Sequence, residues 1–172
     1  MSDAPCHVRQ ARPKDVPEIF AMLRELAIFE KLEHQLTASE DDMHQALFVG
    51  RHAEALVAEV AADDPSEPQL VGYAIYFENF STFLCKPGIY LEDIYVRPAF
   101  RNRGIGKKVL QTLAGIAVER KCGRMEWAVL DWNQNAIDVY QAIGGDVLPD
   151  WRITRLGTDA IEKLAGGCQS DA

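Results

Sequence analysis

The stretch YLEDIYVRPAFRNRGIGKKV, Tyr90–Val109, runs from a strand-like segment through a basic, glycine-containing turn into a helical pattern. Its first residues are mainly β-branched and aromatic, as is typical of a strand, and Ile105 and Val109 open a spacing typical of a buried helix face. A helix that starts beside glycines presents unpaired backbone N–H groups and the positive end of its dipole. The turn Arg101–Gly106 therefore predicts an anion site between a strand and a helix.

Two better-known phosphate motifs are excluded by spacing. The phosphate loop of NTPases needs glycine four residues before Gly-Lys and Ser or Thr after it, where this chain has Arg101 and Lys108. The dinucleotide fingerprint needs glycine or alanine at Val109 and belongs to a first βα turn. A glycine turn with solvated basic side chains remains the structural alternative.

Composition and charge limit the classes of function. The 172 residues are 48% hydrophobic, which suits a single domain over residues 1–172. The net charge of −8 disfavours nucleic acid as a partner, and no apolar run has the length of a signal peptide or membrane helix. We expect a cytoplasmic protein with no membrane contact. The scattered cysteines lack metal-ligand spacing, so we expect free thiols and no metal at Cys6, Cys85, Cys122 and Cys168.

Strand and helix patterns alternate along the chain, which predicts an α/β fold. Strands are expected over 7–11, 54–60, 70–80, 88–96, 124–130 and 151–157, and a loop at Asp63–Pro68. Helices are expected from a capping box at Asp15 and Glu18, from Thr37 to about Phe48, from Ile105 to Ile116, and over 133–145.

A second segment, AVLDWNQNAIDVYQAIGG (128–145), together with the RxxGxG turn, resembles the GNAT superfamily of acyl-CoA-dependent N-acetyltransferases. LRELAIFEKLE (23–33), YLEDIYV (90–96) and AVLDWNQ (128–134) are similar to its diamine acetyltransferase family, first the thialysine branch and then the spermidine/spermine branch. The resemblance covers Arg9 to Leu164. It implies acetyl-CoA as cosubstrate, the primary amine of a small cationic acceptor, direct attack in a ternary complex, and a homodimer. It also implies a mixed, mostly antiparallel sheet, splayed at the acetyl-CoA site and flanked by helices.

The resemblance assigns cofactor contacts by position. Backbone groups of Ile94, Tyr95 and Val96 would meet the pantetheine arm. The pyrophosphate loop would be Arg101, Asn102, Arg103, Gly104, Ile105, Gly106 and Lys107; the next helix would add Asn133, Gln134, Asn135, Ala136 and Tyr140, the last near the sulfur. Asn102 replaces the usual glycine, and asparagine tolerates the left-handed region. The link from Gly145 to Trp151 is shorter than in animal relatives, which affects acceptor choice.

The chemistry of amine acetylation points to an acid and a base. Glu92 is the candidate base or substrate anchor, and Tyr140 the candidate acid for the leaving thiolate. Because Glu92 and Asp93 are adjacent on a strand, they should point to opposite faces unless a bulge intervenes. By resemblance the acceptor site comprises Phe29, Glu30, Glu92, Asp93, Glu126, Trp127 and Ala128.

Structural interpretations stay open for several of these residues. Tyr140 and Trp127 suit an apolar core, Phe29 a half-exposed helix end, Glu92 a solvated strand position, and Asp93 an arginine partner. The first acceptor hypothesis is a thialysine- or lysine-like amine, and the second a polyamine. A peptide amine acetyltransferase and a non-catalytic acetyl-CoA-binding module are the alternatives from other classes.

Overall fold

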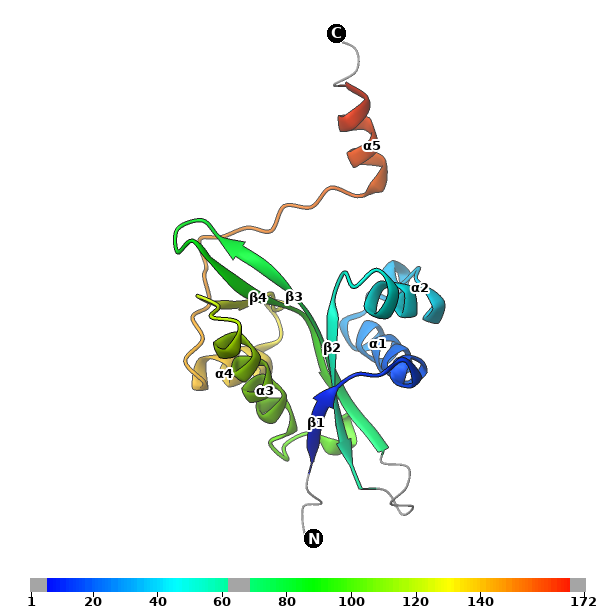
Figure 1. Ribbon diagram of the computed structural model, residues 1–172, viewed down its shortest axis with the longest axis vertical. Helices are drawn as coiled ribbons and strands as arrows, with labels where there is room; N and C mark the ends of the chain where they lie inside the picture. The colour runs from blue at the N-terminus through cyan, green and yellow to red at the C-terminus, as the bar shows by residue number, and fades with distance from the viewer. Residues whose placement is uncertain (1–5, 62–68, 168–172) are drawn as a thin grey trace. The chain divides into compact units, whose positions relative to one another are not determined.

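The computed structural model describes residues 6–61 and 69–167 (Figure 1). They form two compact units, divided between Ala128 and Val129, and each unit is described by itself. The expected loop Asp63–Pro68 and the expected free thiol Cys168 lie outside the described residues. Cys6, Cys85 and Cys122 are free thiols, as predicted.

The first unit is built on a five-stranded sheet in the order β1-β2-β3-β4-β5. Its strands are β1 (His7–Gln10), β2 (Glu54–Val60), β3 (Gln69–Ser81), β4 (Lys86–Val96) and β5 (Met125–Trp127). The first four strands pair antiparallel in turn, and β4 pairs parallel with β5. This confirms the α/β class and the mixed, mostly antiparallel sheet.

Helices cover both faces of this sheet (Figure 1). One face carries α1 (Val16–Glu30) and α2 (Glu40–His44), which continues into the π-helical turn η3 (Gln45–Val49). The core under α1 contains Phe20, Met22 and Leu26 packed with Tyr73 of β3 and Tyr95 of β4. The opposite face carries α3 (Ile105–Glu119), which buries Ile105, Val109, Leu110, Leu113 and Ala117. The spacing read from the sequence is therefore the buried stripe of α3.

Two helix starts differ from the predictions. Asp15 occupies the N-cap position of α1, as predicted, but its side chain makes no capping hydrogen bond to that helix; its carboxylate accepts the backbone N–H of Arg12 and closes the short turn η1 (Pro13–Asp15). Asp15 is instead buried in an ion pair with Arg9, at 2.7 Å. The second helix is capped by Ser39 rather than Thr37, because Ser39 and Asp42 exchange the reciprocal hydrogen bonds of a capping box. Two further short turns are η2 (Glu33–Gln35) and η4 (Pro98–Phe100).

The second unit contains α4 (Gln134–Ala142) and α5 (Thr158–Gly167). The strand expected at 151–157 was wrong: that segment has no regular secondary structure, and α5, which was not expected, follows it. Alternating side chains indicate a strand, but a strand also needs a neighbour for its backbone hydrogen bonds, and no described strand pairs with this segment. The strand expected over 124–130 shortens to the three residues of β5 for the same reason.

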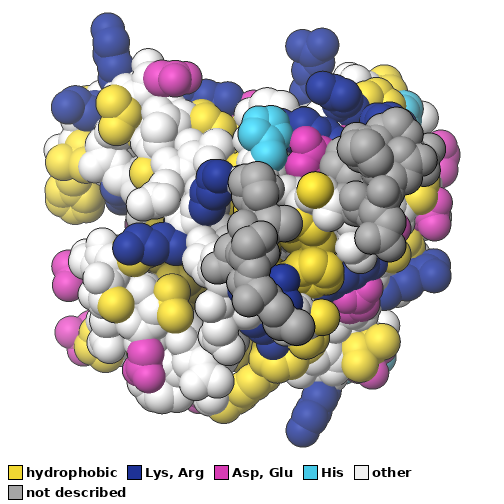
Figure 2. All heavy atoms as spheres, turned by 90° about the horizontal axis from the view of Figure 1, so that it is seen from below, with side chains coloured by type: hydrophobic (Ala, Val, Ile, Leu, Met, Phe, Trp, Pro, Cys, Tyr) yellow, Lys and Arg dark blue, Asp and Glu magenta, His cyan; other side chains and the backbone are white. Residues whose placement is uncertain are grey.

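The described surface carries no other large-scale feature that selects a function. None of the described helices has the length and apolarity to cross a membrane. Within 6–61 and 69–167, no group of three or more His, Cys, Asp or Glu residues is arranged to hold a metal ion. Figure 2 shows Lys and Arg side chains scattered among apolar and acidic ones on the face that it presents.

Candidate active site

A β-bulge in β4 decides how the two adjacent carboxylates lie. Ile75 of β3 pairs with Asp93, whereas the next residue, Tyr76, pairs with Leu91. Glu92 is thus an extra residue with no partner on β3, and the bulge shifts the alternation of side chains along β4. Asp93 comes to the α1 face of the sheet, with Glu92 exposed beside it. The sequence predicted that Glu92 and Asp93 point to opposite faces unless a bulge intervenes, and the structure has that bulge.

Two neighbouring carboxylates act on Asp93. Burial raises the pKa of Asp93, and together with the charges of Glu92 and Glu30 it brings that pKa to about 6. Burial also raises the pKa of Glu30, the last residue of α1. Among the described residues Asp93 has no ion pair, so the expected arginine partner is wrong for the part of the chain that the structure covers. A group of carboxylates without a cation is suited to bind an ammonium group.

Two tyrosines lie on the same face of the sheet as Asp93. Tyr73 and Tyr95 are cross-strand partners on the α1 face, with ring centres 6.4 Å apart. The Tyr95 hydroxyl donates to Glu25 of α1 at 3.1 Å, and Arg97 donates to the same carboxylate at 2.9 Å. Neither Tyr73 nor Glu25 was singled out from the sequence. A tyrosine inside a strand pattern and a glutamate on a helix carry no local signal of a site.

The glycine turn has the backbone conformation of an anion site. Asn102 and Gly104 both adopt left-handed conformations, with φ of 61° and 75°. Asparagine therefore takes the place of the usual glycine without altering the turn, as expected. Gly104 is the N-cap of α3, whose first N–H groups receive no side-chain cap, and the space where a Gly104 Cβ would project is open. Free N–H groups beside open space fit the phosphates of a cofactor.

Arg101 connects this turn to the acceptor end of α1. Its guanidinium lies 5.2 Å from the centre of the Phe29 ring and 5.4 Å from that of Tyr95. Its Nε donates to the carbonyl of Val96 at 2.8 Å. Two groups predicted on separate grounds, the pyrophosphate loop and Phe29, are therefore in direct contact.

The outer edge of β4 opens at the same place. Parallel pairing of β4 with β5 covers only Ile89–Leu91 against Met125–Trp127. From Glu92 to Val96 no other described strand pairs with this edge, which includes the predicted pantetheine contacts Ile94, Tyr95 and Val96. Backbone groups along a strand edge that no strand covers can pair with an extended ligand, although the Val96 carbonyl here already accepts from Arg101.

The predicted acceptor residues of β5 have other partners. Glu126 accepts the side-chain amide of Asn79 at 2.9 Å and forms an ion pair with Arg124 at 2.9 Å. Trp127 is partly buried, and Ala128 follows the end of β5. The register places Glu126 beside Tyr90 rather than beside Glu92. Their role at the acceptor stays a prediction.

The remaining predicted residues belong to the second unit. The side chain of Asn133 caps α4 by accepting the N–H of Ala136 at 3.3 Å, and Gln134 donates to Asp138 at 2.6 Å. Asn135 is exposed at the first turn of α4, and Tyr140 is partly buried toward its end. Their roles stay predictions.

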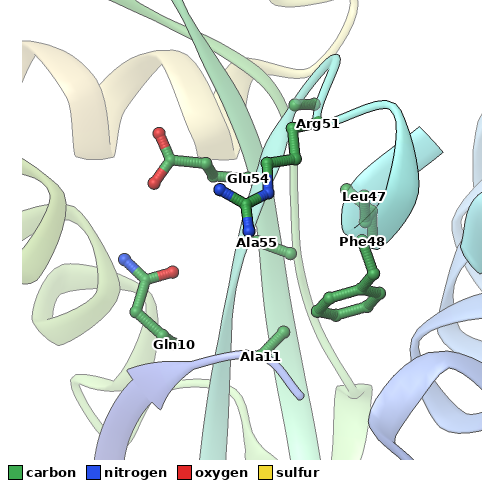
Figure 3. Close-up of a pocket in the computed structure, with 8 residues that line it drawn as sticks. Gln10, Ala11, Leu47, Phe48, Arg51, Glu54 and Ala55 are labelled. Atoms are coloured by element: carbon green, nitrogen blue, oxygen red, sulfur yellow. The ribbon is translucent and has the colours of Figure 1, made fainter. Parts of the chain in front are cut away.

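A pocket of about 420 Å³ lies in another part of the first unit, between β1, β2 and η3 (Figure 3). Figure 3 shows the side chains of Gln10, Arg51 and Glu54 around it. Glu54 already accepts two hydrogen bonds from Arg120, at 2.6 and 2.7 Å. None of the predicted site residues lines this pocket, so the candidate active site remains at the β4 bulge and the glycine turn.

An open strand edge, an uncapped helix start and a group of carboxylates are features suited to a transferase that binds an anionic cofactor and a cationic acceptor. The sequence profile of the Acetyltransferase (GNAT) family matches residues 20–144. The chain belongs to this family and is an acetyl-transferring enzyme.

Individual relatives agree with that assignment. The chain is 38% identical over 165 residues to the thialysine N-epsilon-acetyltransferase of Bos taurus, covering 92% of this chain and 96% of the relative. It is 30% identical over 197 residues to an L-ornithine N5-acetyltransferase of Arabidopsis thaliana, covering 91% and 86%. A solved integron cassette protein of V. cholerae has the same fold, with a TM-score of 0.71, 21% identity, and coverage of 93% and 97%.

Proposed function

We propose that this protein transfers acetyl from acetyl-CoA to the terminal primary amine of a thialysine- or lysine-like amino acid, in a ternary complex. The observation that carries the proposal is the carboxylate group Glu30, Glu92 and Asp93 beside the open edge of β4 and the glycine turn. The names of two relatives, a thialysine and an L-ornithine acetyltransferase, both specify a basic amino acid with a terminal amine.

The carboxylates can bind the ammonium group of the acceptor and take the proton that it must lose before it attacks. An alkyl ammonium has a pKa of about 10.4, so at neutral pH about one molecule in a thousand is a nucleophile, a deficit of roughly 4 kcal/mol. Glu92, exposed at the bulge, is the proposed proton acceptor or anchor, and Glu30 and Asp93 hold the cationic chain. Asp93 is the second candidate for the base, because a pKa of about 6 is better matched to neutral pH.

The turn and α3 provide the proposed binding site for the cofactor phosphates, through the N–H groups of Ile105, Gly106 and Lys107 and the charges of Arg101 and Arg103. When bound, acetyl-CoA supplies the thioester whose carbonyl carbon the amine attacks. Tyr140 of α4 is the proposed acid that protonates the departing thiolate. The family match from 20 to 144 runs across the boundary between the two units and supports a single GNAT domain.

A polyamine is the second candidate acceptor, since Asp93 and the two carboxylates that act on it suit a chain with several ammonium groups. The test is thiol release from acetyl-CoA with thialysine, lysine, ornithine, diamines, spermidine, an aminoglycoside and a peptide. We expect the highest kcat/KM for a basic amino acid. A preference for spermidine would favour the polyamine, a preference for the peptide would replace the proposal, and no turnover would support the non-catalytic module.

We also propose a homodimer. Large apolar side chains are exposed along the second unit, among them Trp151 at 76%, Ile153 at 73% and Leu164 at 68%. Apolar side chains in such number on one segment are typical of an interface. Sedimentation equilibrium should give twice the monomer mass, and Ile153→Asp should give the monomer; a monomeric wild type would contradict the proposal.

A further inference from the structure

The buried hydroxyl of Tyr73 has no role in the proposed site or reaction. The residue is fully buried on β3 under α1, and among the described residues its hydroxyl has no hydrogen-bond partner. Tyr76, equally buried, differs: it accepts from Gln10 at 2.8 Å and donates to Glu54 at 3.2 Å. A buried hydroxyl without a partner is unfavourable, so a native protein normally provides one.

The strand register identifies the acceptor. Tyr73 pairs with Tyr95, and Ile75 with Asp93, so Tyr73 and Asp93 are diagonal neighbours on the α1 face. The register from Tyr73 to Ile75 is unbroken, so ordinary alternation along both strands places the two side chains on this face. Asp93 exerts the largest effect of any charged group on the Tyr73 hydroxyl, followed by Glu30, and both raise its pKa beyond the effect of burial.

We propose that the Tyr73 hydroxyl donates a hydrogen bond to the Asp93 carboxylate through one water molecule and acts as a positioning residue for it. A bridging water would satisfy the buried hydroxyl, which makes no direct hydrogen bond to a described residue. This inference rests on the proposed function for its role in catalysis, and adds to that site a residue to which neither the sequence nor the relatives assigned a role.

The charges around Asp93 explain why such a donor matters. Glu92 on β4 and Glu30 on α1 are both negative and disfavour a third charge. The cations Arg97 and Arg101 act on Tyr95 instead, and Arg97 is bound by Glu18 and Glu25. Tyr73 on β3 is therefore the described neighbour that can favour the ionised form of Asp93 with a hydrogen bond.

The direct test is the titration of the Asp93 carboxyl by ¹³C NMR in the full-length protein without substrate. Tyr73→Phe removes one oxygen and keeps the ring in the core. It should raise the midpoint of Asp93 by about one pH unit, because the charged form loses a hydrogen bond. Tyr76→Phe, at an equally buried position on the other face, is the matched control and should leave that midpoint unchanged. An unchanged midpoint in Tyr73→Phe would overturn the inference.

A second measurement does not depend on the stability of a Tyr73 variant. In wild-type protein labelled with 3-fluorotyrosine, the ¹⁹F signal of Tyr73 should titrate with the midpoint of Asp93. Asp93→Asn should abolish that titration. A Tyr73 signal that ignores the titration of Asp93 would also overturn the inference.

Kinetics connects the pair to the reaction. The acid limb of kcat/KM for thialysine should move up by the same amount in Tyr73→Phe, while the rate on the alkaline side changes little. A loss of rate at every pH, without a shift of the limb, would indicate a purely structural role and overturn the inference. If no amine is acetylated by the wild type, the proposed function fails, whereas the two titrations still decide the Tyr73–Asp93 pair.

Discussion

The guanidinium of Arg101 lies over the ring of Phe29, 5.2 Å from its centre, and so joins the glycine turn to the end of α1. The same side chain donates to the backbone carbonyl of Val96 at the end of β4. One cation thus joins the end of α1 to a distant part of the sequence, the end of β4 and the turn that follows it. Because Arg101 belongs to the proposed pyrophosphate loop and Phe29 to the proposed acceptor site, each ligand should affect the binding of the other.

The contact between Arg101 and Phe29 predicts measurable coupling. Arg101→Lys keeps the charge but loses the planar group that stacks and the Nε donor, so it should weaken acetyl-CoA binding. A double-mutant cycle with Phe29→Leu should give a coupling of about 0.5–1 kcal/mol in the binding free energy of acetyl-CoA, measured by calorimetry. Arg103→Lys is the control, because Arg103 lies over Phe100 instead, at 5.3 Å. Additive effects for Arg101 and Phe29 would contradict the coupling.

Asp93 should control the acid side of the pH profile. Its pKa is raised to about 6 by burial, Glu92 and Glu30, so below that pH the group is protonated and no longer attracts an ammonium. The kcat/KM for thialysine should therefore rise with pH to a midpoint near 6. Glu92→Gln removes a like charge and should lower this midpoint, and Asp93→Asn should lower kcat/KM and remove the limb. A limb unaffected by Asp93→Asn would assign it to another group.

The raised pKa of Asp93 also makes the stability of the fold depend on pH, and this contribution falls as pH rises. The pKa of Asp93 is higher in the folded state than in the unfolded state, so between about pH 4 and 6 the folded state binds more protons. Its contribution to the free energy of unfolding is therefore full below about pH 4, is lost as pH rises to 6, and is constant above. Urea unfolding across this range should show a smaller decline in Asp93→Asn than in the wild type. Equal declines in both proteins would mean that Asp93 titrates normally.

The space beside Gly104 is open, so we expect CoA binding to be sensitive to a larger side chain at this position. Valine there would have to adopt a φ of 75° and would fill the space in which the phosphates are proposed to lie, so the Kd for CoA should rise more than tenfold. Gly115→Val is the control, because Gly115 lies within α3 and also has open space around it. Asn102→Gly should preserve binding, since glycine readily adopts the φ of 61° found at this position.

Thermal unfolding offers an independent measure of the same site. A hundredfold excess of CoA over its Kd should stabilise the wild type by about 2.7 kcal/mol, and NAD should stabilise it little. At the same CoA concentration the stabilisation should fall to about 1.4 kcal/mol or less in Gly104→Val and persist in Gly115→Val. Equal stabilisation of the wild type by NAD would contradict the cofactor assignment.

Tyr140→Phe separates a catalytic role from a structural one. If the hydroxyl protonates the leaving thiolate, kcat should fall by about 10²- to 10⁴-fold while the Kd for acetyl-CoA stays nearly constant. If the ring only packs, the change costs at most about 1 kcal/mol of stability and leaves turnover almost unaffected. Stopped-flow or steady-state kcat at saturating acetyl-CoA, together with the melting temperature, distinguishes the two. A stable variant within threefold of the wild-type kcat would falsify the acid role.

The sequence by itself determined the elements that local patterns encode. Apolar segments rich in β-branched and aromatic residues indicated β2, β3 and β4, the spacing from Ile105 indicated α3, and Asn102 and Gly104 indicated a turn before it. The family could be identified because these motifs occur in order along the chain. The strand expected at 151–157 is absent from the structure, because a local pattern is not sufficient for a strand, which also requires a neighbouring strand.

Only the tertiary structure decided how the carboxylates of the site lie. Glu92 and Asp93 are adjacent in every conformation, but whether they share a site depends on a one-residue bulge against β3. The electrostatic interaction of Tyr73 with Asp93 and the contact of Arg101 with Phe29 depend in the same way on register and packing between distant segments. A shift of one residue turns each side chain to the other face of a sheet, and the free energy that selects the register comes from the whole packed core. No local stretch of sequence contains that free energy.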